Sequence, residues 1–198
     1  RVLFRSLCLS ALDDAPAAVR ASVHSVADAS YVYTLTKPKA KALGLQKVTV
    51  GVADKRAASP AFKQAVAVAL GQGLAKEWGN RPANHATPTL LAQAAKDLAK
   101  HAAIDCKVHG PKEVAKLGMG AFLAVAQGSK EPLQFIELTY QGAAKSQAPV
   151  VLVGKGITFD TGGISLKPAA AMDEMKFDMC GAASVLGVFR SLAELKPA

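Results

Sequence analysis

Four charged residues that could hold metal ions lie within a short stretch of the sequence: Lys155, Asp160, Lys167 and Asp178. Aspartate carboxylates are hard oxygen ligands for divalent cations. A lysine can join them only as a neutral amine, and two adjacent dications together with burial could lower its pKa far enough from about 10.4. A lysine that stays protonated could instead polarise a carbonyl group or stabilise a developing oxyanion. The spacing alone fits ordinary ion pairs as well, so both interpretations stay open at this point.

The glycines around Lys155 raise the alternative of a phosphate-binding loop, because glycine allows a backbone to approach a ligand closely. The Walker pattern requires a glycine five residues before the glycine that precedes the lysine, and a serine or threonine directly after the lysine. The sequence has Pro149 and Gly156 at these two places. No Gly-x-Gly-x-x-Gly pattern opens a helix here either. Nucleotide binding through either motif is therefore disfavoured.

The elements that must position these residues alternate between strand and helix. Strand patterns cover 47–52, 104–108, 135–140 and 150–153, and helix patterns cover 60–78, 87–98, 111–117 and 181–195. Ser59-Pro60 and Thr87-Pro88 each provide an N-cap followed by proline at the first helical position. The alternation predicts an α/β fold with a mixed, mostly parallel sheet flanked by helices. Residues 150–153 are apolar throughout, as in a central strand buried on both faces, so the loop after Val153 would lie at the sheet edge where ligands bind.

The stretch that contains the four charged residues is long and distinctive. It reads Val153-Gly154-Lys155-Gly156-Ile157-Thr158-Phe159-Asp160-Thr161-Gly162-Gly163-Ile164-Ser165-Leu166-Lys167-Pro168 and continues with Met172-Asp173-Glu174-Met175-Lys176 and Asp178-Met179-Cys180-Gly181-Ala182-Ala183. Shorter stretches are Asn80-Arg81-Pro82-Ala83-Asn84, Leu117-Gly118-Met119-Gly120-Ala121 and Ala126-Gln127-Gly128-Ser129. Together they closely resemble the cytosol (leucyl) aminopeptidase family. The resemblance extends from about residue 60 to residue 198.

The resemblance implies a role for each of five residues. Lys155, Asp160 and Asp178 match ligands of a centre with two divalent ions, Mn²⁺ or Zn²⁺, in which Asp160 bridges the ions. Lys167 matches the catalytic lysine. Met175 matches a residue that lines the pocket for the first side chain of the substrate.

The same resemblance implies a reaction and its setting. The family removes N-terminal amino acids from peptides with a free N-terminus, using a water molecule that the two metals activate. Because the substrate amine must be neutral to coordinate, we expect activity to favour mildly alkaline pH. Family members are cytoplasmic and assemble as homo-hexamers.

The resemblance also implies a domain organisation in which the catalytic domain is incomplete. Residues 1–59 would be the remnant of a smaller α/β N-terminal domain, 60–84 a connecting helix and linker, and 85–198 the first part of the catalytic peptidase domain. Since the sequence opens on Arg1 and its last apolar helix lies close to its end, we expect a fragment truncated at both ends. The later family motif Asn-Thr-Asp-Ala-Glu-Gly-Arg, with two further carboxylate ligands and an arginine, is not in the sequence. We therefore expect the fragment to bind metal poorly and to be inactive.

Charge and composition limit the other classes of function. The formal net charge is +9, and residues 1–110 carry most of it, with 15 Lys+Arg against 7 Asp+Glu. Some family members also bind DNA, so a DNA-binding or regulatory protein is the alternative, although scattered charge without interleaved aromatic residues indicates a solvated face. No run of about 18 uninterrupted apolar residues is present to span a membrane. The three cysteines, Cys8, Cys106 and Cys180, are odd in number and far apart, which fits a reducing compartment.

Overall fold

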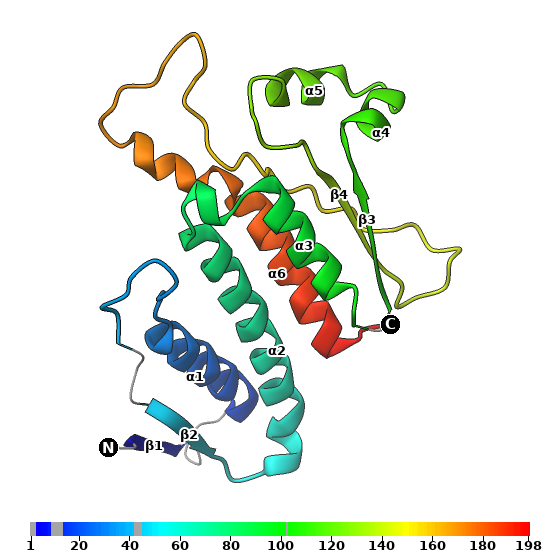
Figure 1. The fold of residues 1–198 in the computed structure, drawn as a ribbon. Helices are drawn as coiled ribbons and strands as arrows, with labels where there is room; N and C mark the ends of the chain where they lie inside the picture. Colours follow the sequence, from blue (N-terminus) through cyan, green and yellow to red (C-terminus); the bar gives the residue numbers. More distant parts are fainter. Residues whose placement is uncertain (1–2, 9–13, 42–44, 102) are drawn as a thin grey trace.

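Two long helices lie side by side at the centre of the molecule, and the other elements are arranged around them (Figure 1). The helices are α2 (Lys55–Asn80) and α6 (Cys180–Leu195), and they run in opposite directions, with Gly71 next to Gly187 and Gly79 next to Cys180. The structure is a computed structural model that describes residues 3–8, 14–41, 45–101 and 103–198. The mixture of helices and strands confirms the predicted α/β class at this coarse level.

A small β-α-β unit lies on one side of α2. Its strands β1 (Leu3–Cys8) and β2 (Leu45–Gly51) pair in parallel, and α1 (Ala15–Ser30) connects them. The side chain of Asp14 caps α1 by accepting a hydrogen bond from the Ala17 amide at 2.9 Å. An ion pair between Lys76 and Asp28 joins α1 to α2. The N-terminal part of the chain is thereby attached to the central helix rather than to the second sheet.

A second two-stranded sheet lies on the other side of the central helices. Its strands β3 (Ile104–His109) and β4 (Phe135–Tyr140) confirm the strands predicted at 104–108 and 135–140. They pair antiparallel, with Ile104 opposite Tyr140, so of the two described strand pairs one is parallel and one antiparallel, and the mostly parallel sheet stays a prediction. The antiparallel pairing follows from the connection, because α4 (Pro111–Lys116) and α5 (Gly120–Ala126) sit at one end of the strands in Figure 1 and do not cross back over the sheet.

The central strand predicted at residues 150–153 is not formed in this structure. These residues belong to neither sheet of the described chain, and Val150 and Val153 are 90% and 93% exposed. An apolar run indicates where a strand would be buried, but a strand needs a partner for its backbone hydrogen bonds. No strand of either described sheet pairs with this segment. It runs as irregular chain toward the start of α6 (Figure 1).

Helix α2 begins earlier than the sequence predicts. Its N-cap is Asp54, whose carboxylate accepts from the amides of Arg56 and Ala57, rather than Ser59. Pro60 consequently lies inside the helix, which costs about 3 kcal/mol in an ordinary helix interior. The aspartate cap and burial of Ala61 offset part of that cost.

Among the described residues, no helix is both long and apolar enough to cross a lipid bilayer.

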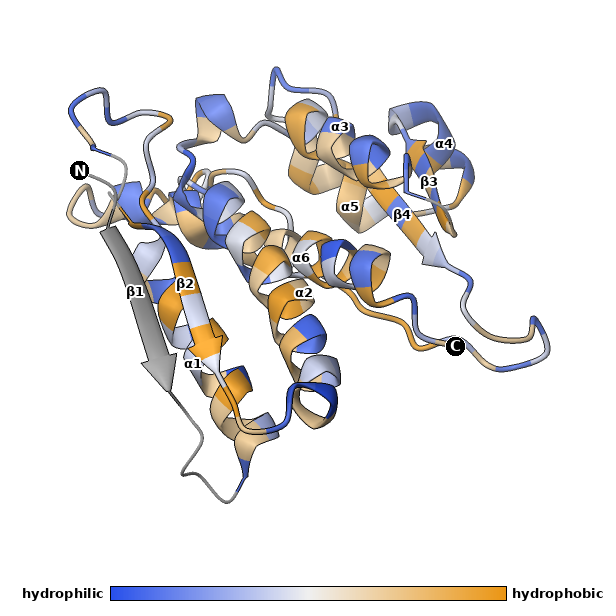
Figure 2. Ribbon diagram, turned by 90° about the horizontal axis from the view of Figure 1, so that it is seen from below, coloured by the Kyte–Doolittle hydropathy of each residue, from blue (hydrophilic) through white to orange (hydrophobic). Residues whose placement is uncertain are grey.

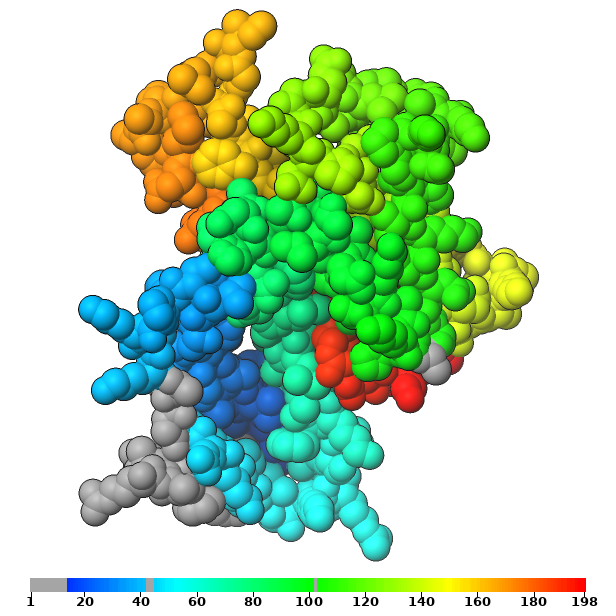
Figure 3. Space-filling view, viewed as in Figure 1, coloured from blue at the N-terminus to red at the C-terminus, as the bar shows by residue number. Residues whose placement is uncertain are grey.

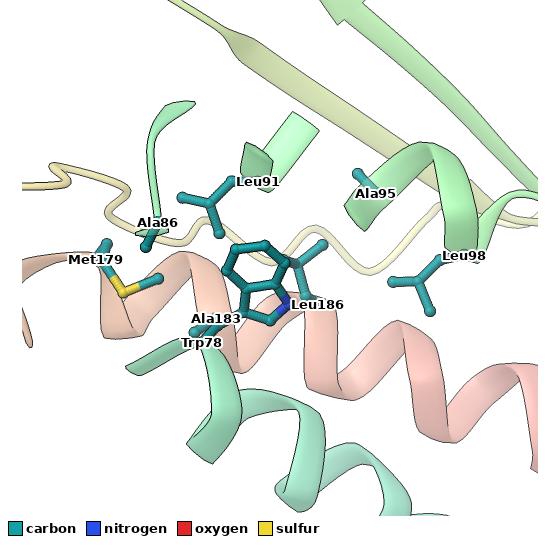
Figure 4. Packing of buried hydrophobic residues seen from close by; sticks show 8 residues of the cluster. All are labelled: Trp78, Ala86, Leu91, Ala95, Leu98, Met179, Ala183 and Leu186. Carbon is teal, nitrogen blue, oxygen red and sulfur yellow. The ribbon is translucent and has the colours of Figure 1, made fainter. Parts of the chain in front are cut away.

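The main apolar core forms where α2, α3 (Pro88–Leu98) and α6 meet, as Figure 4 shows. The 3-10 turn η1 (Ala83–His85) leads from α2 into α3, whose N-cap Thr87 accepts from the Leu90 amide as predicted. Trp78 packs between Leu91 of α3 and Leu186 of α6, and all three are at most 6% exposed. Along α2 and α6, apolar residues alternate with polar ones (Figure 2), as expected for helices that bury only part of their surface. Met179, the residue before α6, belongs to this core, and Asp178 directly precedes it.

Candidate metal centre

The predicted site residues lie in and after an irregular loop that follows residues 150–153. The loop runs from Gly154 to Ala171 and projects from the body of the molecule in the space-filling view of Figure 3. It returns through the 3-10 helix η2 (Met172–Met179), which leads directly into α6. Lys155 and Asp178 therefore lie at the two ends of the segment formed by the loop and η2, beside the start of α6.

Lys155 and Asp178 form the first close contact of the site. The Lys155 Nζ atom lies 2.7 Å from Asp178 Oδ1. The Lys155 side chain is 60% exposed, whereas that of Asp178 is only 16% exposed because its neighbour Met179 anchors this end of η2 in the core. The structure thus brings together two residues that are 23 positions apart in the sequence.

The second oxygen of Asp178 supports a cation at this place. Oδ2 is buried and has no hydrogen-bond partner among the described residues. A buried carboxylate oxygen without a partner is unfavourable, and a bound divalent cation is one way to compensate it. Carboxylate oxygens are among the ligands that Mn²⁺ and Zn²⁺ accept, so the chemistry of Asp178 fits such an ion.

Asp160 and Lys167 form the second pair, within a tight turn of the loop. The Lys167 Nζ atom donates to Asp160 Oδ2 at 2.8 Å, and the Gly162 amide donates to Asp160 Oδ1 at 2.8 Å. The Lys167 ammonium group is the main cause of a lowered pKa of the Asp160 carboxyl, and the Gly162 amide is the next. Gly162 has φ of +92°, and a side chain there would collide with the Ser165 carbonyl oxygen, so this turn needs glycine.

The two ion pairs are neighbours, but their carboxylates do not form a shared cluster. The positive charge of Lys155 also helps to lower the pKa of Asp160, which places Lys155 near both aspartates. No group of three or more His, Cys, Asp or Glu side chains within the described ranges could hold a metal ion. In this structure the four residues are therefore paired as Lys155 with Asp178 and Lys167 with Asp160, the ion-pair arrangement that their spacing also allowed.

Met175 lies on η2, three residues before Asp178, and is partly buried. Side chains three residues apart in a 3-10 helix point in nearly the same direction. Met175 and Asp178 are therefore placed on the same side of η2, as a residue that lines a pocket beside a metal ligand would have to be. Its role in a substrate pocket remains a prediction.

Sequence reasoning missed the contact that holds the two ends of the loop together. The Ala182 amide at the start of α6 donates to the Lys155 carbonyl oxygen at 2.8 Å, and Gly154 and Gly181 meet backbone to backbone beside it. Both glycines belong to the quoted stretch, but no spacing rule connects them because they are 27 residues apart. Only their placement in space identifies them as neighbours.

Comparisons with known proteins agree on one family. The family described as "Cytosol aminopeptidase family, catalytic domain" matches residues 73–198. A probable cytosol aminopeptidase of Acidovorax ebreus (strain TPSY) is 70% identical over 181 residues, which are 91% of this chain and 36% of that protein. Another, from Polaromonas sp. (strain JS666 / ATCC BAA-500), is 64% identical over 191 residues, 96% of this chain and 38% of that protein.

A solved structure resembles the chain as a whole. The bottromycin maturation enzyme BotP in complex with Mn superimposes with a TM-score of 0.77 at 34% identity, and the match covers 96% of this chain and 41% of that one. The chain spans little more than a third of the curated relatives described above.

Proposed function

The chain belongs to the cytosol aminopeptidase family, a family of hydrolases, and on that premise we propose that it carries the first ligands of a metal-dependent aminopeptidase. The proposed reaction is hydrolysis of the N-terminal peptide bond in peptides with a free N-terminus. The observation that carries the proposal is the buried, unpaired Oδ2 of Asp178 beside the amine of Lys155. Since the chain covers 36% of the Acidovorax relative, the activity is proposed for the whole protein to which these residues contribute.

We assign Lys155, Asp160 and Asp178 as residues that would hold two divalent ions. Mn²⁺ is favoured over Zn²⁺ because BotP, 34% identical to this chain, has been solved in complex with Mn. When bound, such ions supply Lewis acidity that activates a water molecule and stabilises developing negative charge. Asp178 is held for this task by the buried Met179 that follows it.

Lys167 would donate a hydrogen bond to the oxyanion that forms as the peptide carbonyl is attacked. Its Nζ atom is held at 2.8 Å by Asp160, so a carboxylate that would bind metal also orients the lysine. Met175, on the side of η2 that carries Asp178, would contact the first side chain of the substrate. The proposed role of Lys167 needs its ammonium group to stay charged.

The chain would supply only part of this centre. The motif Asn-Thr-Asp-Ala-Glu-Gly-Arg, with two further carboxylates and an arginine, is not in its sequence. We propose that these 198 residues alone bind metal weakly and show no peptidase activity.

We also propose that in the whole protein residues 150–153 join a mostly parallel sheet, and that this protein is a cytoplasmic homo-hexamer. No observation favours the DNA-binding alternative, and it is not proposed.

A chimera tests the proposal directly. The 181 matched residues of this chain replace the corresponding segment of the Acidovorax relative, and release of the N-terminal residue from leucine p-nitroanilide is measured with Mn²⁺ present. We expect activity in the chimera and a decrease in kcat of about 100-fold or more for Lys167→Met, because an oxyanion donor is lost. Lys130→Met, an exposed lysine outside the site, is the matched control. A folded, metal-loaded chimera without activity, or equal rates for the two lysine variants, would refute the assignment.

A further inference from the structure

Two glycines from distant parts of the chain meet at a distance that leaves no room for a side chain. A Cβ atom at Gly154 would lie 2.5 Å from the Gly181 carbonyl oxygen, and one at Gly181 would lie 2.7 Å from the Lys155 amide nitrogen. Both contacts are below 3.0 Å, a separation that real Cβ atoms essentially never show, and both are with backbone that cannot rotate away. At this spacing only glycine fits on either side.

Two further interactions join the same segments. The Ala182 amide donates to the Lys155 carbonyl oxygen at 2.8 Å. The Lys155 Nζ atom lies 2.7 Å from Asp178 Oδ1. Gly154 directly precedes Lys155, and Gly181 follows Asp178 by three residues. The glycine contact therefore determines how closely the backbone that carries Lys155 approaches the backbone that carries Asp178.

A second glycine contact fixes the position of α6 on the rest of the protein. A Cβ at Gly187 would lie 2.6 Å from the Gly71 carbonyl oxygen of α2. This contact is equally tight, but it lies on the interface between α2 and α6 and joins no residue of the site. An alanine at Gly187 would therefore disturb the packing of α6 on α2 without separating Lys155 from Asp178, and it serves as a comparison.

We propose that Gly154 and Gly181 are positioning residues of the metal centre, whose bare backbones set the separation of Lys155 and Asp178. The inference rests on the proposed function, since it concerns ligands of that centre. An ordinary contact for a Cβ atom begins at 3.4 Å, so an alanine at Gly181 has to move the two segments apart by roughly 0.7 Å. Metal ligands tolerate deviations of only about 0.2 Å in distance.

The experiment measures Mn²⁺ affinity of the 198-residue chain by electron paramagnetic resonance titration. Gly181→Ala and Gly154→Ala should raise the Mn²⁺ Kd about 10- to 100-fold, the usual effect of disturbing groups that orient metal ligands. Gly156→Ala is the matched control in the same loop, because its Cβ would meet only the Ala182 Cβ, at 3.3 Å. We expect its Kd to stay within about twofold of the original.

Gly187→Ala separates positioning from stability. We expect it to lower the melting temperature while the Kd of the folded protein stays within about twofold. If Gly181→Ala and Gly154→Ala leave the Kd unchanged, or if Gly187→Ala weakens binding as much as they do, the positioning role is overturned. If neither site variant folds by circular dichroism, the contact belongs to the fold and the proposal is likewise overturned.

Asp178→Asn distinguishes failure of this inference from failure of the proposed function. Weaker binding by Asp178→Asn with unchanged binding by both glycine variants overturns only the positioning role. Unchanged binding by Asp178→Asn, or no Mn²⁺ binding by the original chain up to about 10 mM, overturns the proposed metal centre and this inference with it.

Discussion

Alanine at Gly71 should destabilise the protein, whereas alanine at Gly73 in the same helix should stabilise it. In the structure a Cβ at Gly71 would lie 2.1 Å from Ser191 Oγ and 2.3 Å from the Gly187 carbonyl oxygen of α6. A Cβ at Gly73 would meet nothing within 4 Å. The two variants make the same chemical change two residues apart in α2, and they differ in what the new methyl group contacts.

The magnitude follows from two opposing contributions. Glycine to alanine in a helix interior stabilises by about 0.5–1 kcal/mol, which is the whole effect expected at Gly73. At Gly71 the serine hydroxyl can rotate, but the Gly187 carbonyl cannot, so α2 and α6 must separate by roughly 1 Å at their crossing. Overpacking of this kind costs about 1–3 kcal/mol. After the helix gain is subtracted, the net cost spans about 0–2.5 kcal/mol, and from the central values we expect Gly71→Ala to lower the free energy of unfolding by about 1 kcal/mol.

The assay is urea denaturation followed by far-ultraviolet circular dichroism, with the midpoint and slope fitted for each variant. Opposite shifts of the midpoint at unchanged slope support the close packing of α2 against α6. If both alanine variants shift the midpoint in the same direction and by the same amount, the two helices do not meet at Gly71, and the placement of α6 is refuted.

Three further predictions follow from local interactions. The lowered pKa of Asp160 means that its pair with Lys167 stabilises the fold above the ordinary aspartate pKa of about 3.9, and that this contribution is lost as pH falls through the lowered value. Carboxyl ¹³C resonances should show a lowered pKa for Asp160 and a higher one after Lys167→Met; equal titration curves would contradict this. Thr87→Ala removes the N-cap of α3 and should cost about 1 kcal/mol in urea denaturation, while exposed Thr89→Ala should be near neutral. Burial raises the pKa of the Cys180 thiol, so in a Cys8→Ser, Cys106→Ser background it should react with an aromatic disulfide more slowly at pH 8 than glutathione does; an equal rate would count against its burial.

Local sequence patterns predicted the elements that depend on local chemistry. Thr87-Pro88 identified the start of α3, and the apolar spacing identified α6 to within one residue of its first residue. The four charged residues and Met175 were predicted because they belong to one distinctive stretch, and their roles stay predictions. In each case the information lies in neighbouring residues, where caps and apolar periodicity act.

Features that depend on distant pairing could not be predicted in the same way. The direction of β4 relative to β3 and the lack of a described partner strand for residues 150–153 are decided by which other strands are available, and alternation does not encode that. Helix α2 began at Lys55 because an aspartate cap outweighed the boundary suggested by Pro60. The contact of Gly154 with Gly181 was invisible because glycines carry no pattern of their own.

The central claim is that Lys155, Asp160 and Asp178 share one metal centre, and paramagnetic broadening of NMR signals by Mn²⁺ tests it most directly. At substoichiometric Mn²⁺, we expect the backbone signals of these three residues to disappear first, before those of the exposed acidic pair Asp173-Glu174 in η2. Broadening centred on Asp173 and Glu174, or spread evenly over the acidic residues of the chain, would contradict the claim.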